Sequence, residues 1–156
     1  MEPTLRDATL ADAEFLFSLR TDPVVVEASN GIPPASLGHQ MLWLEKTLES
    51  PDRLLFIVEN QNAMGTESVG QCRLDLMEHG LVAEVSIALI RAARGQGVGT
   101  EVLKILALAA AHHGVRWLEA VIKETNHASR KAFLKAGYSV EEIKDGLVHM
   151  GYKCGS

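Results

Sequence analysis

The sequence predicts an α+β fold in which a mostly antiparallel sheet of about seven strands is flanked by about four helices. Apolar residues recur at helical spacing in some segments and at strand spacing in others. Two short turns, His79-Gly80 and Asp145-Gly146, separate segments that have the pattern of antiparallel strands. The expected order is βααβββαβαββ. The chain has 156 residues, 47% of them hydrophobic, which is enough for one core, so we expect a single domain over 1–156.

The first third of the chain predicts one strand followed by two helices. After a short β-like piece, Thr9 and Asp12 form a helix-start signal, and an apolar helical pattern then ends near residues 20–23. Residues 24–34 mix β-branched residues with turn formers and predict an irregular connection. Ser36 is placed to cap a second helix over about 37–50. On that helix we expect these apolar side chains to face the core: Met41, Leu42, Leu44 and Leu48.

The remaining two-thirds predicts most of the sheet and two more helices. A helix is expected from near Glu101 to a C-cap at His113-Gly114, and another over 126–136. A polar loop is expected over 61–67. Strands are expected at 54–58, 68–77, 81–90, 117–122, 139–144 and 147–152.

Composition excludes several classes of function. The net charge of −5 argues against a nucleic-acid surface, where clustered Lys and Arg supply most of the affinity. The two cysteines, Cys72 and Cys154, are far apart and predict neither a disulfide framework nor a zinc site, and no histidine has metal-ligand spacing. No apolar run is long enough for a membrane span or a signal peptide. We therefore expect a cytoplasmic protein without a metal.

The segment with the clearest chemistry is Arg94-Gly95-Gln96-Gly97-Val98-Gly99-Thr100, between an apolar strand and an amphipathic helix. A glycine-rich turn that opens a helix exposes main-chain N–H groups at the positive end of the helix dipole, which is a site for a phosphate. A P-loop would need Gly-Lys-Ser/Thr, and a dinucleotide fingerprint would need a third glycine at position six; both are absent. The segment predicts an anion site of another kind.

This chain resembles the GNAT superfamily of N-acetyltransferases, whose acetyl-CoA motif reads Gln/Arg-x-x-Gly-x-Gly/Ala; residues 94–99 match every fixed position. Downstream the family often has Asn-x-x-Ala-x-x-x-Tyr-x-x-x-Gly-Phe. This chain keeps the spacing with altered identities, as Asn126, Ser129, Phe133, Gly137 and Tyr138. The opening residues 5–9 with Asp12 are also similar to many members, so the resemblance spans essentially the whole chain.

The resemblance implies where acetyl-CoA binds. Main-chain amides of Gln96 to Thr100 are expected to hold the pyrophosphate, and the pantetheine arm is expected beside the strand end at Leu89-Ile90. Asn126 would hold the pantetheine or line the acyl channel. The simpler alternatives are that the glycines only make a tight turn and that Asn126 only caps a helix. The expected cofactor-binding residues are Leu89, Ile90, Arg94, Gly95, Gln96, Gly97, Val98, Gly99, Thr100, Asn126, Ser129 and Phe133.

The implied reaction is attack of a primary amine on the thioester, which needs a neutral amine, an oxyanion donor and a leaving thiolate. A backbone N–H near Leu89 or Ile90 is expected to be the oxyanion donor. Glu84 is the first candidate base; because Arg73 is expected diagonally across from it, a plain salt bridge is an equal alternative. Glu124, on the same strand face as Asn126, is the second candidate, with a solvated loop carboxylate as its alternative.

Two aromatic positions bear on the leaving thiolate. Many members have a tyrosine, which protonates the thiolate, where this chain has Phe133, and a phenyl ring has no proton to give. Tyr138 is either a catalytic residue or a core anchor. A thiol with a pKa near ~8.5 leaves substantially as thiolate, so catalysis does not require that proton. A CoA-binding regulatory domain without turnover is an alternative that Phe133 motivates.

The acceptor must be inferred from the first third of the chain. Residues 20–55 resemble a GNAT branch that acetylates amino-sugar nucleotides, although that branch has His where this chain has Gln40. Arg20, Trp43 and Arg73 are the expected substrate-binding residues, because a nucleotide diphosphate needs cations and an aromatic platform; the alternative is a packed Trp and solvated arginines. A peptide or protein N-terminus or another small amine is the runner-up acceptor. Many relatives dimerise, so a homodimer is expected as well.

Overall fold

The computed structural model describes residues 1–29 and 31–155, and their strands form one sheet in the order β1-β2-β3-β4-β5-β7-β6. Its strands are β1 (Pro3–Asp7), β2 (Arg53–Asn62), β3 (Gly65–Met77), β4 (Val82–Leu89), β5 (Trp117–Lys123), β6 (Ser139–Lys144) and β7 (Leu147–Lys153). The α-helices are α1 (Ala13–Arg20), α2 (Pro23–Ala28), α3 (Leu37–Glu49), α4 (Val98–His112) and α5 (His127–Lys135). All neighbouring strands are antiparallel except β4 and β5. The predicted fold class is confirmed.

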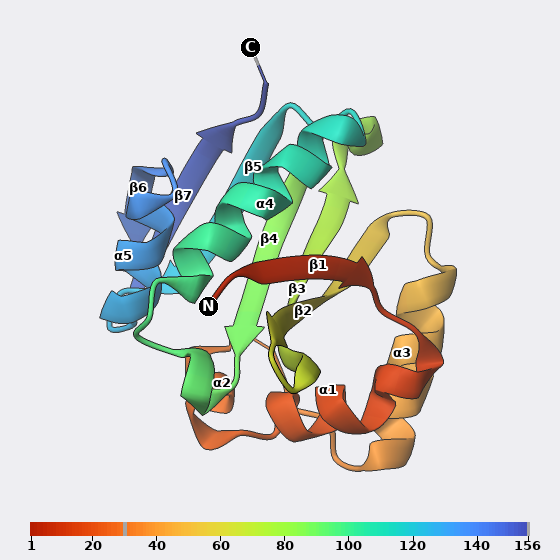
Figure 1. Ribbon diagram of the computed structural model, residues 1–156. Helices are drawn as coiled ribbons and strands as arrows, with labels where there is room; N and C mark the ends of the chain where they lie inside the picture. Colours follow the sequence, from red (N-terminus) through yellow and green to blue (C-terminus); the bar gives the residue numbers. More distant parts are fainter. Residues whose placement is uncertain (30, 156) are drawn as a thin grey trace.

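Helices lie on both faces of the sheet (Figure 1). Along β2, Phe56 and Val58 belong to the larger core cluster, to which α4 contributes Val102, Leu103 and Leu106, each 0% exposed. The alternate residues of β2 pack with α1 and α3 in a second cluster on the opposite face: Ala8, Ala13, Leu16, Leu44, Leu55 and Ile57. Burying each large aliphatic side chain stabilises the fold by about 1.5–3 kcal/mol. The two clusters hold α1 and α3 on one side and α4 on the other.

Several predicted boundaries are confirmed by specific caps. The Ser36 side chain accepts a hydrogen bond from His39 N (3.2 Å) and begins α3. Asp12 accepts from Thr9 N (2.8 Å), closing the start of the 3₁₀ turn Leu10–Asp12 that leads into α1. Arg6 Nη2 bonds to Asp12 Oδ1 at 2.7 Å, and this hydrogen bond lowers the pKa of the Asp12 carboxyl. The entry to α1 is therefore fixed to β1.

Three expectations about local structure were wrong. Residues 24–34 were expected to be irregular, but Pro23–Ala28 form α2, because Asp22 Oδ1 accepts from Val24 N (2.9 Å) and proline suits a first helical turn; Asn30 lies outside the described residues. The expected polar loop 61–67 is a tight hairpin, because cross-strand pairing extends β2 and β3 as far as Asn62↔Gly65. Helix α4 begins at Val98, inside the glycine-rich segment, and not near Glu101.

The buried face of α3 also differs from the expectation. Leu44 is fully buried, but Met41, Leu42 and Leu48 are 38%, 57% and 39% exposed. The buried positions are instead Gln40, Leu44 and Thr47, which share one face of the helix at spacings of four and three. The apolar pattern did not predict the buried face of α3, because that face carries polar side chains. One of them, Gln40, accepts a hydrogen bond from Arg20.

The sheet opens between β4 and β5. These strands are parallel and pair only over Val82–Glu84 with Trp117–Glu119. Ile90 N donates to Val69 O (2.8 Å). Because main-chain groups on an antiparallel strand alternate in direction, Ile87 and Leu89 turn their N–H and C=O groups away from β3 and toward the opening. The opening thus has main-chain donors and acceptors along one wall.

None of the helices in the described part of the chain is long and apolar enough to cross a membrane.

Candidate active site

The glycine loop, residues 94–100, presents main-chain N–H groups at the start of α4. Glu101 N donates to Gly97 O (3.2 Å) as the first helical bond, so Val98, Gly99 and Thr100 have N–H groups with no acceptor inside the helix. Gly95 and Gly97 have φ angles of 74° and 77°, a region where side chains are strained. A Cβ built at either glycine would meet no described atom within 4 Å. The loop therefore has both the open space and the donors that a phosphate requires.

Arg94 fastens the glycine loop to its surroundings. Its Nε donates to Leu89 O (3.0 Å), and its Nη2 lies 3.2 Å from Asp22 Oδ1 at the start of α2. The Gln96 side chain also folds back, with Nε2 donating to Ala92 O (2.7 Å). These side chains shape the loop, and the main-chain amides remain its binding groups.

The N–H groups of Leu89 and Ile90, the two expected candidates for the oxyanion donor, point to opposite sides of β4. The sequence left the two open, but Ile90 N–H is already bonded to Val69 O. Leu89 N–H is directed to the side of β4 that faces away from β3. A β-bulge between Val58 and Glu59 bends the β2–β3 pair here, and Gly70 packs so closely on the end of β4 that a Cβ would lie 2.5 Å from Ala88 O. The position of the Leu89 main chain is thus tightly fixed.

Asn126 lies at the far side of the opening, on the turn between β5 and α5. Its Oδ1 accepts from Ser129 N (3.2 Å), so the helix-cap role is present. The same residue lines a hollow of about 330 Å³ between α2 and the end of β5, together with Pro23, Val24, Glu27, Ala28, Lys123 and Thr125. Lys123 Nζ donates to Glu27 O, which ties α2 to β5. The opening between β4 and β5 is therefore bridged by α2.

Phe133 and Tyr138 both lie in the core. They are 2% and 3% exposed, and their rings meet edge to face with centroids 4.8 Å apart. The Tyr138 hydroxyl is buried without a hydrogen-bond partner among the described residues, and burial raises the pKa of that hydroxyl well above its usual range. This packing favours the core-anchor interpretation of Tyr138, and Phe133, expected to contact the cofactor, is also almost entirely buried.

A comparison with protein families identifies the fold and the loop together. A family model described as an acetyltransferase (GNAT) domain matches residues 4–139, which is most of the chain. The chain belongs to the GNAT acetyltransferase family. This GNAT protein is therefore an acetyl-CoA-dependent N-acetyltransferase, which transfers an acetyl group from acetyl-CoA to an amine. The glycine loop and the open edge of β4 have the donor groups that this cosubstrate requires.

Individual relatives agree on the family and differ in acceptor. The Bacillus subtilis (strain 168) protein named "Putative phosphinothricin acetyltransferase YwnH" is 28% identical over 152 residues, covering 96% of this chain and 92% of its own. The fold matches spermidine N-acetyltransferase from Vibrio cholerae in complex with CoA and spermine (TM-score 0.86, 15% identity, 98% and 96% of the two chains). It also matches aminoglycoside acetyltransferase AAC(6')-Ib in complex with coenzyme A and kanamycin (TM-score 0.78, 19% identity, 97% and 94%).

The two candidate bases occupy different environments in this GNAT protein. Glu84 lies on β4, half-buried, directly opposite Asp75 of β3. The expected Glu84–Arg73 salt bridge is not formed, because Arg73 bonds to Asp75 at 2.9 and 3.1 Å. Glu124 was expected on the face of a strand, which is wrong: β5 ends at Lys123, and the exposed Glu124 lies in the following turn. The environment of Glu124 is that of a solvated turn carboxylate.

Arg20, Trp43 and Arg73 come together from α1, α3 and β3, and we call them the arginine cluster. The Arg20 guanidinium carbon lies 4.2 Å from the centroid of the Trp43 ring, and that of Arg73 lies 5.5 Å away. Arg20 Nη1 donates to Gln40 Oε1 (2.9 Å). Burial, and then the charge of Arg73, lower the pKa of Arg20. Two cations thus share one ring on the α1–α3 side of the sheet.

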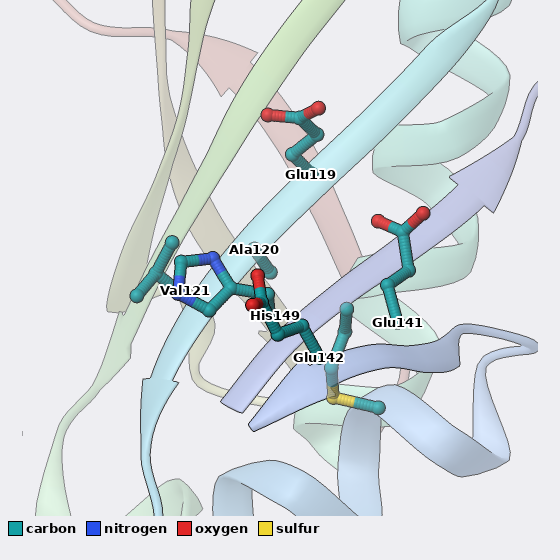
Figure 2. A pocket seen from close by; sticks show the side chains of 7 residues that line it. Glu119, Ala120, Val121, Glu141, Glu142 and His149 are labelled. Carbon is teal, nitrogen blue, oxygen red and sulfur yellow. The ribbon is translucent and has the colours of Figure 1, made fainter. Parts of the chain in front are cut away.

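A second hollow, of about 450 Å³, lies on the other half of the sheet, and we call it the acidic hollow (Figure 2). It is lined by Glu119, Ala120, Val121, Glu141, Glu142, His149 and Met150. Figure 2 shows the Glu119 side chain on β5 and the Glu141 side chain on β6, the two strands on either side of β7. Glu119 of β5 pairs in register with Glu84 of β4, so β4 lies between the acidic hollow and the arginine cluster.

Sequence reasoning did not assign a role to two buried glutamines near the arginine cluster. Gln40 is 0% exposed and Gln71 is 6% exposed. Gln40 Nε2 and Gln71 Oε1 are buried without a hydrogen-bond partner among the described residues. A signal was present for each: Gln71 continues the polar alternation with Arg73 and Asp75, and Gln40 stands where the amino-sugar branch has a histidine.

Proposed function

We propose that the acceptor is a primary amine carried on an anionic small molecule, with a nucleotide-linked amino sugar as the leading class. The observation that carries this proposal is the arginine cluster. Arg20 and Arg73 approach one Trp43 ring within 4.2 and 5.5 Å, on the face of the sheet that carries Glu84. Guanidinium groups are well suited to phosphate, because their planar donors match its oxygens.

The charge balance of the cluster supports an anionic ligand. Arg73 is compensated by Asp75, whereas no carboxylate of the described residues lies within ion-pair distance of Arg20. A half-buried cation with another cation beside it is costly unless an anion joins them. The Trp43 ring supports the cations by cation–π contact, so its role is to hold the arginines rather than to stack on a nucleotide base. A diphosphate would complete the cluster.

The position of the cluster fits an acceptor that reaches the thioester. Arg73 pairs with Ser86, which is three residues before Leu89 on β4, a separation of about 10 Å at the rise of a strand. A phosphate at the cluster would leave one sugar ring to span the distance to the acetyl group. An amine on that sugar would then lie near the main chain of Leu89.

The proposed reaction is direct attack without a covalent enzyme intermediate. The amine nitrogen forms a bond to the thioester carbonyl carbon, and Leu89 N–H stabilises the oxyanion. The C–S bond then breaks, and CoA leaves with the electron pair as a thiolate. The proton lost from nitrogen passes to Glu84 through a chain of water molecules, because Glu84 lies five residues, about 17 Å, before Leu89 on β4. Because the thiol has a pKa near ~8.5, departure as thiolate needs no tyrosine at the Phe133 position.

The test is release of free CoA with a panel of amines. We suggest UDP-linked amino sugars with the amine at different ring carbons, the same sugars without the nucleotide, spermidine, and a peptide with a free N-terminus. The expected result is a kcat/KM on one nucleotide-linked sugar about 100-fold above that on its free sugar, as two charge-assisted contacts would give. Arg20→Gln should remove about tenfold or more of that preference. Arg116→Gln, an exposed arginine at the start of β5, is the charge-matched control.

Other outcomes would contradict the proposal. The highest kcat/KM on spermidine would move the acceptor to the acidic hollow, whose three glutamates favour a cationic amine. The highest value on the peptide would favour N-terminal acetylation. Tight acetyl-CoA binding with no turnover of any amine would indicate a regulatory domain.

A further inference from the structure

Two buried glutamine side chains on the α1–α3 side of this protein each have one amide atom without a hydrogen-bond partner among the described residues, and the two atoms have opposite hydrogen-bonding character. Gln40 Nε2 is a donor without an acceptor, and Gln71 Oε1 is an acceptor without a donor. Both side chains are more than nine-tenths buried. A buried polar atom without a partner costs free energy unless a ligand or water completes it. These two atoms therefore point to groups that the bound acceptor supplies.

The unpaired donor lies at the arginine cluster. Gln40 Oε1 accepts from Arg20 Nη1 at 2.9 Å, which fixes the amide so that its oxygen is occupied and its NH₂ group is left over. Gln40 is three residues from Trp43 on α3, so both lie on the same side of the helix. An N–H donor beside two guanidinium groups has one natural partner, which is an anionic oxygen.

The unpaired acceptor lies near the end of β4. Gln71 is directly opposite Ala88 on β4 and Ile57 on β2, so its side chain shares their face of the sheet. Ile57 belongs to the apolar cluster under α1 and α3 and has no hydrogen to donate. Ala88 is the residue before Leu89, and Gly70 holds the two strands in close contact there. An amide oxygen at this place is close to the main chain at which the acetyl group is expected.

We propose that Gln71 Oε1 accepts a hydrogen bond from the attacking amine and that Gln40 Nε2 donates one to the anionic end of the same acceptor. A neutral amine has two N–H donors and one lone pair, so an acceptor on the N–H side orients the lone pair toward the thioester. An amide oxygen does not take the proton, which leaves that role to Glu84. The inference deepens the proposed function and rests on it, but the Gln71 part applies to any primary amine.

The polarity of the two glutamines also fixes the direction of the acceptor. Gln71 and Arg73 are two residues apart on one face of β3, with Gln71 nearer the Leu89 end. The amine end must therefore lie toward Leu89, and the anionic end toward Arg20 and Gln40. An acceptor with the reverse polarity would set a donor against a donor at Gln40 and an acceptor against an acceptor at Gln71.

The test for Gln71 uses Gln71→Met, which keeps the volume but removes the acceptor, on whichever amine in the panel is turned over fastest. We expect KM for the amine to rise about tenfold, while the Kd of acetyl-CoA stays unchanged and the Tm is unchanged or higher. Gln71→Glu keeps an acceptor oxygen and should restore KM to within about threefold of the original. A purely structural role predicts a lower Tm with an unchanged KM, and that result would overturn the assignment.

The test for Gln40 compares a nucleotide-linked amino sugar with the same sugar lacking the nucleotide, by calorimetry on the enzyme–CoA complex. Gln40→Met should weaken binding of the nucleotide-linked sugar about tenfold and leave the free sugar unchanged. Gln40→Glu, which keeps the oxygen that bonds Arg20 but replaces the donor with a charge, should weaken it further. Equal losses on both sugars would overturn the Gln40 assignment. Failure of every nucleotide-linked sugar to bind would instead contradict the proposed function and leave Gln71 to be judged on the amine that is acetylated.

Discussion

The two proposed anion sites, the glycine loop and the arginine cluster, are built by different means. The loop uses main-chain N–H groups of one continuous segment, residues 94–100, at the start of α4. The cluster uses side chains of Arg20, Trp43 and Arg73, which come from two helices and a strand. The loop depends on backbone conformation, so it is most sensitive to substitution of a glycine that has a positive φ angle. The cluster depends on packing between elements, so its weak point is a side chain.

This difference corresponds to two tasks of the protein: binding the cosubstrate, which is general, and recognising the acceptor, which is specific. A phosphate site made of main-chain amides can accept almost any side chain at its non-glycine positions, which suits a cosubstrate that never changes. A site made of side chains changes with each substitution, which suits an acceptor that differs among relatives. The four predictions below test cosubstrate binding, the residues expected to act in the reaction, and the end of β4 next to the glycine loop.

The largest effect is expected from Gly97→Val. Gly97 has a φ of 77°, and a β-branched side chain there is both strained and placed in the space that a phosphate would occupy. Loss of the charge-assisted contacts should weaken acetyl-CoA binding about 100-fold or more, measured by calorimetry. Gly65→Val, at a φ of 122° in the β2–β3 hairpin, is the matched control for backbone strain. Unchanged acetyl-CoA affinity in Gly97→Val would refute the phosphate assignment.

The candidate base is tested by Glu84→Gln. If Glu84 is the base, kcat should fall about 100-fold, the lower end of what a positioned base contributes. Loss of the base should also change how kcat/KM depends on pH. The measurement is the pH dependence of kcat/KM for both proteins. If Glu124→Gln removes that dependence and Glu84→Gln does not, the roles are reversed.

The position of Leu89 at the end of β4 is tested by Gly70→Ala. The added Cβ would lie 2.5 Å from Ala88 O and 2.7 Å from Leu89 Cδ2, so the end of β4 must shift. Overpacking of this kind costs about 1–3 kcal/mol, and we expect about a tenfold loss of kcat/KM together with a lower Tm. Gly38→Ala on α3, where a Cβ meets only Ser36 Oγ at 3.7 Å, should leave activity unchanged. Full activity in Gly70→Ala would show that the position of Leu89 is less critical than we infer.

The smallest effect is expected from Tyr138→Phe. The hydroxyl is buried and has no partner, so its removal relieves a desolvation cost without creating a cavity. We expect kcat within about twofold of the original and an equal or higher Tm. A loss of kcat beyond tenfold, with the Tm unchanged, would return Tyr138 to the reaction as a proton donor.

Residues next to one another in the chain were predictable. The glycine loop, the Ser36 cap and the Asp145-Gly146 hairpin all follow from local conformational preferences that hold in any context. Along α4 the helical spacing of apolar residues in the sequence matches the buried face, because that helix lies on an apolar sheet face: Val102, Leu103, Leu106, Ala107 and Ala110. The same reasoning failed for Met41, Leu42 and Leu48 of α3, whose inner face is polar.

The sequence by itself determined the family and the cosubstrate and predicted a position for the phosphate site, because each depends on short-range spacing around residues 94–99. Only the tertiary structure decided which side chains meet at the acceptor end. Arg73 bonds to Asp75 and not to Glu84, Ile90 N–H is occupied while that of Leu89 faces the opening, and Gln40 and Gln71 are left with unpaired atoms. These outcomes depend on how strands and helices far apart in the chain come together, and no local pattern encodes that geometry.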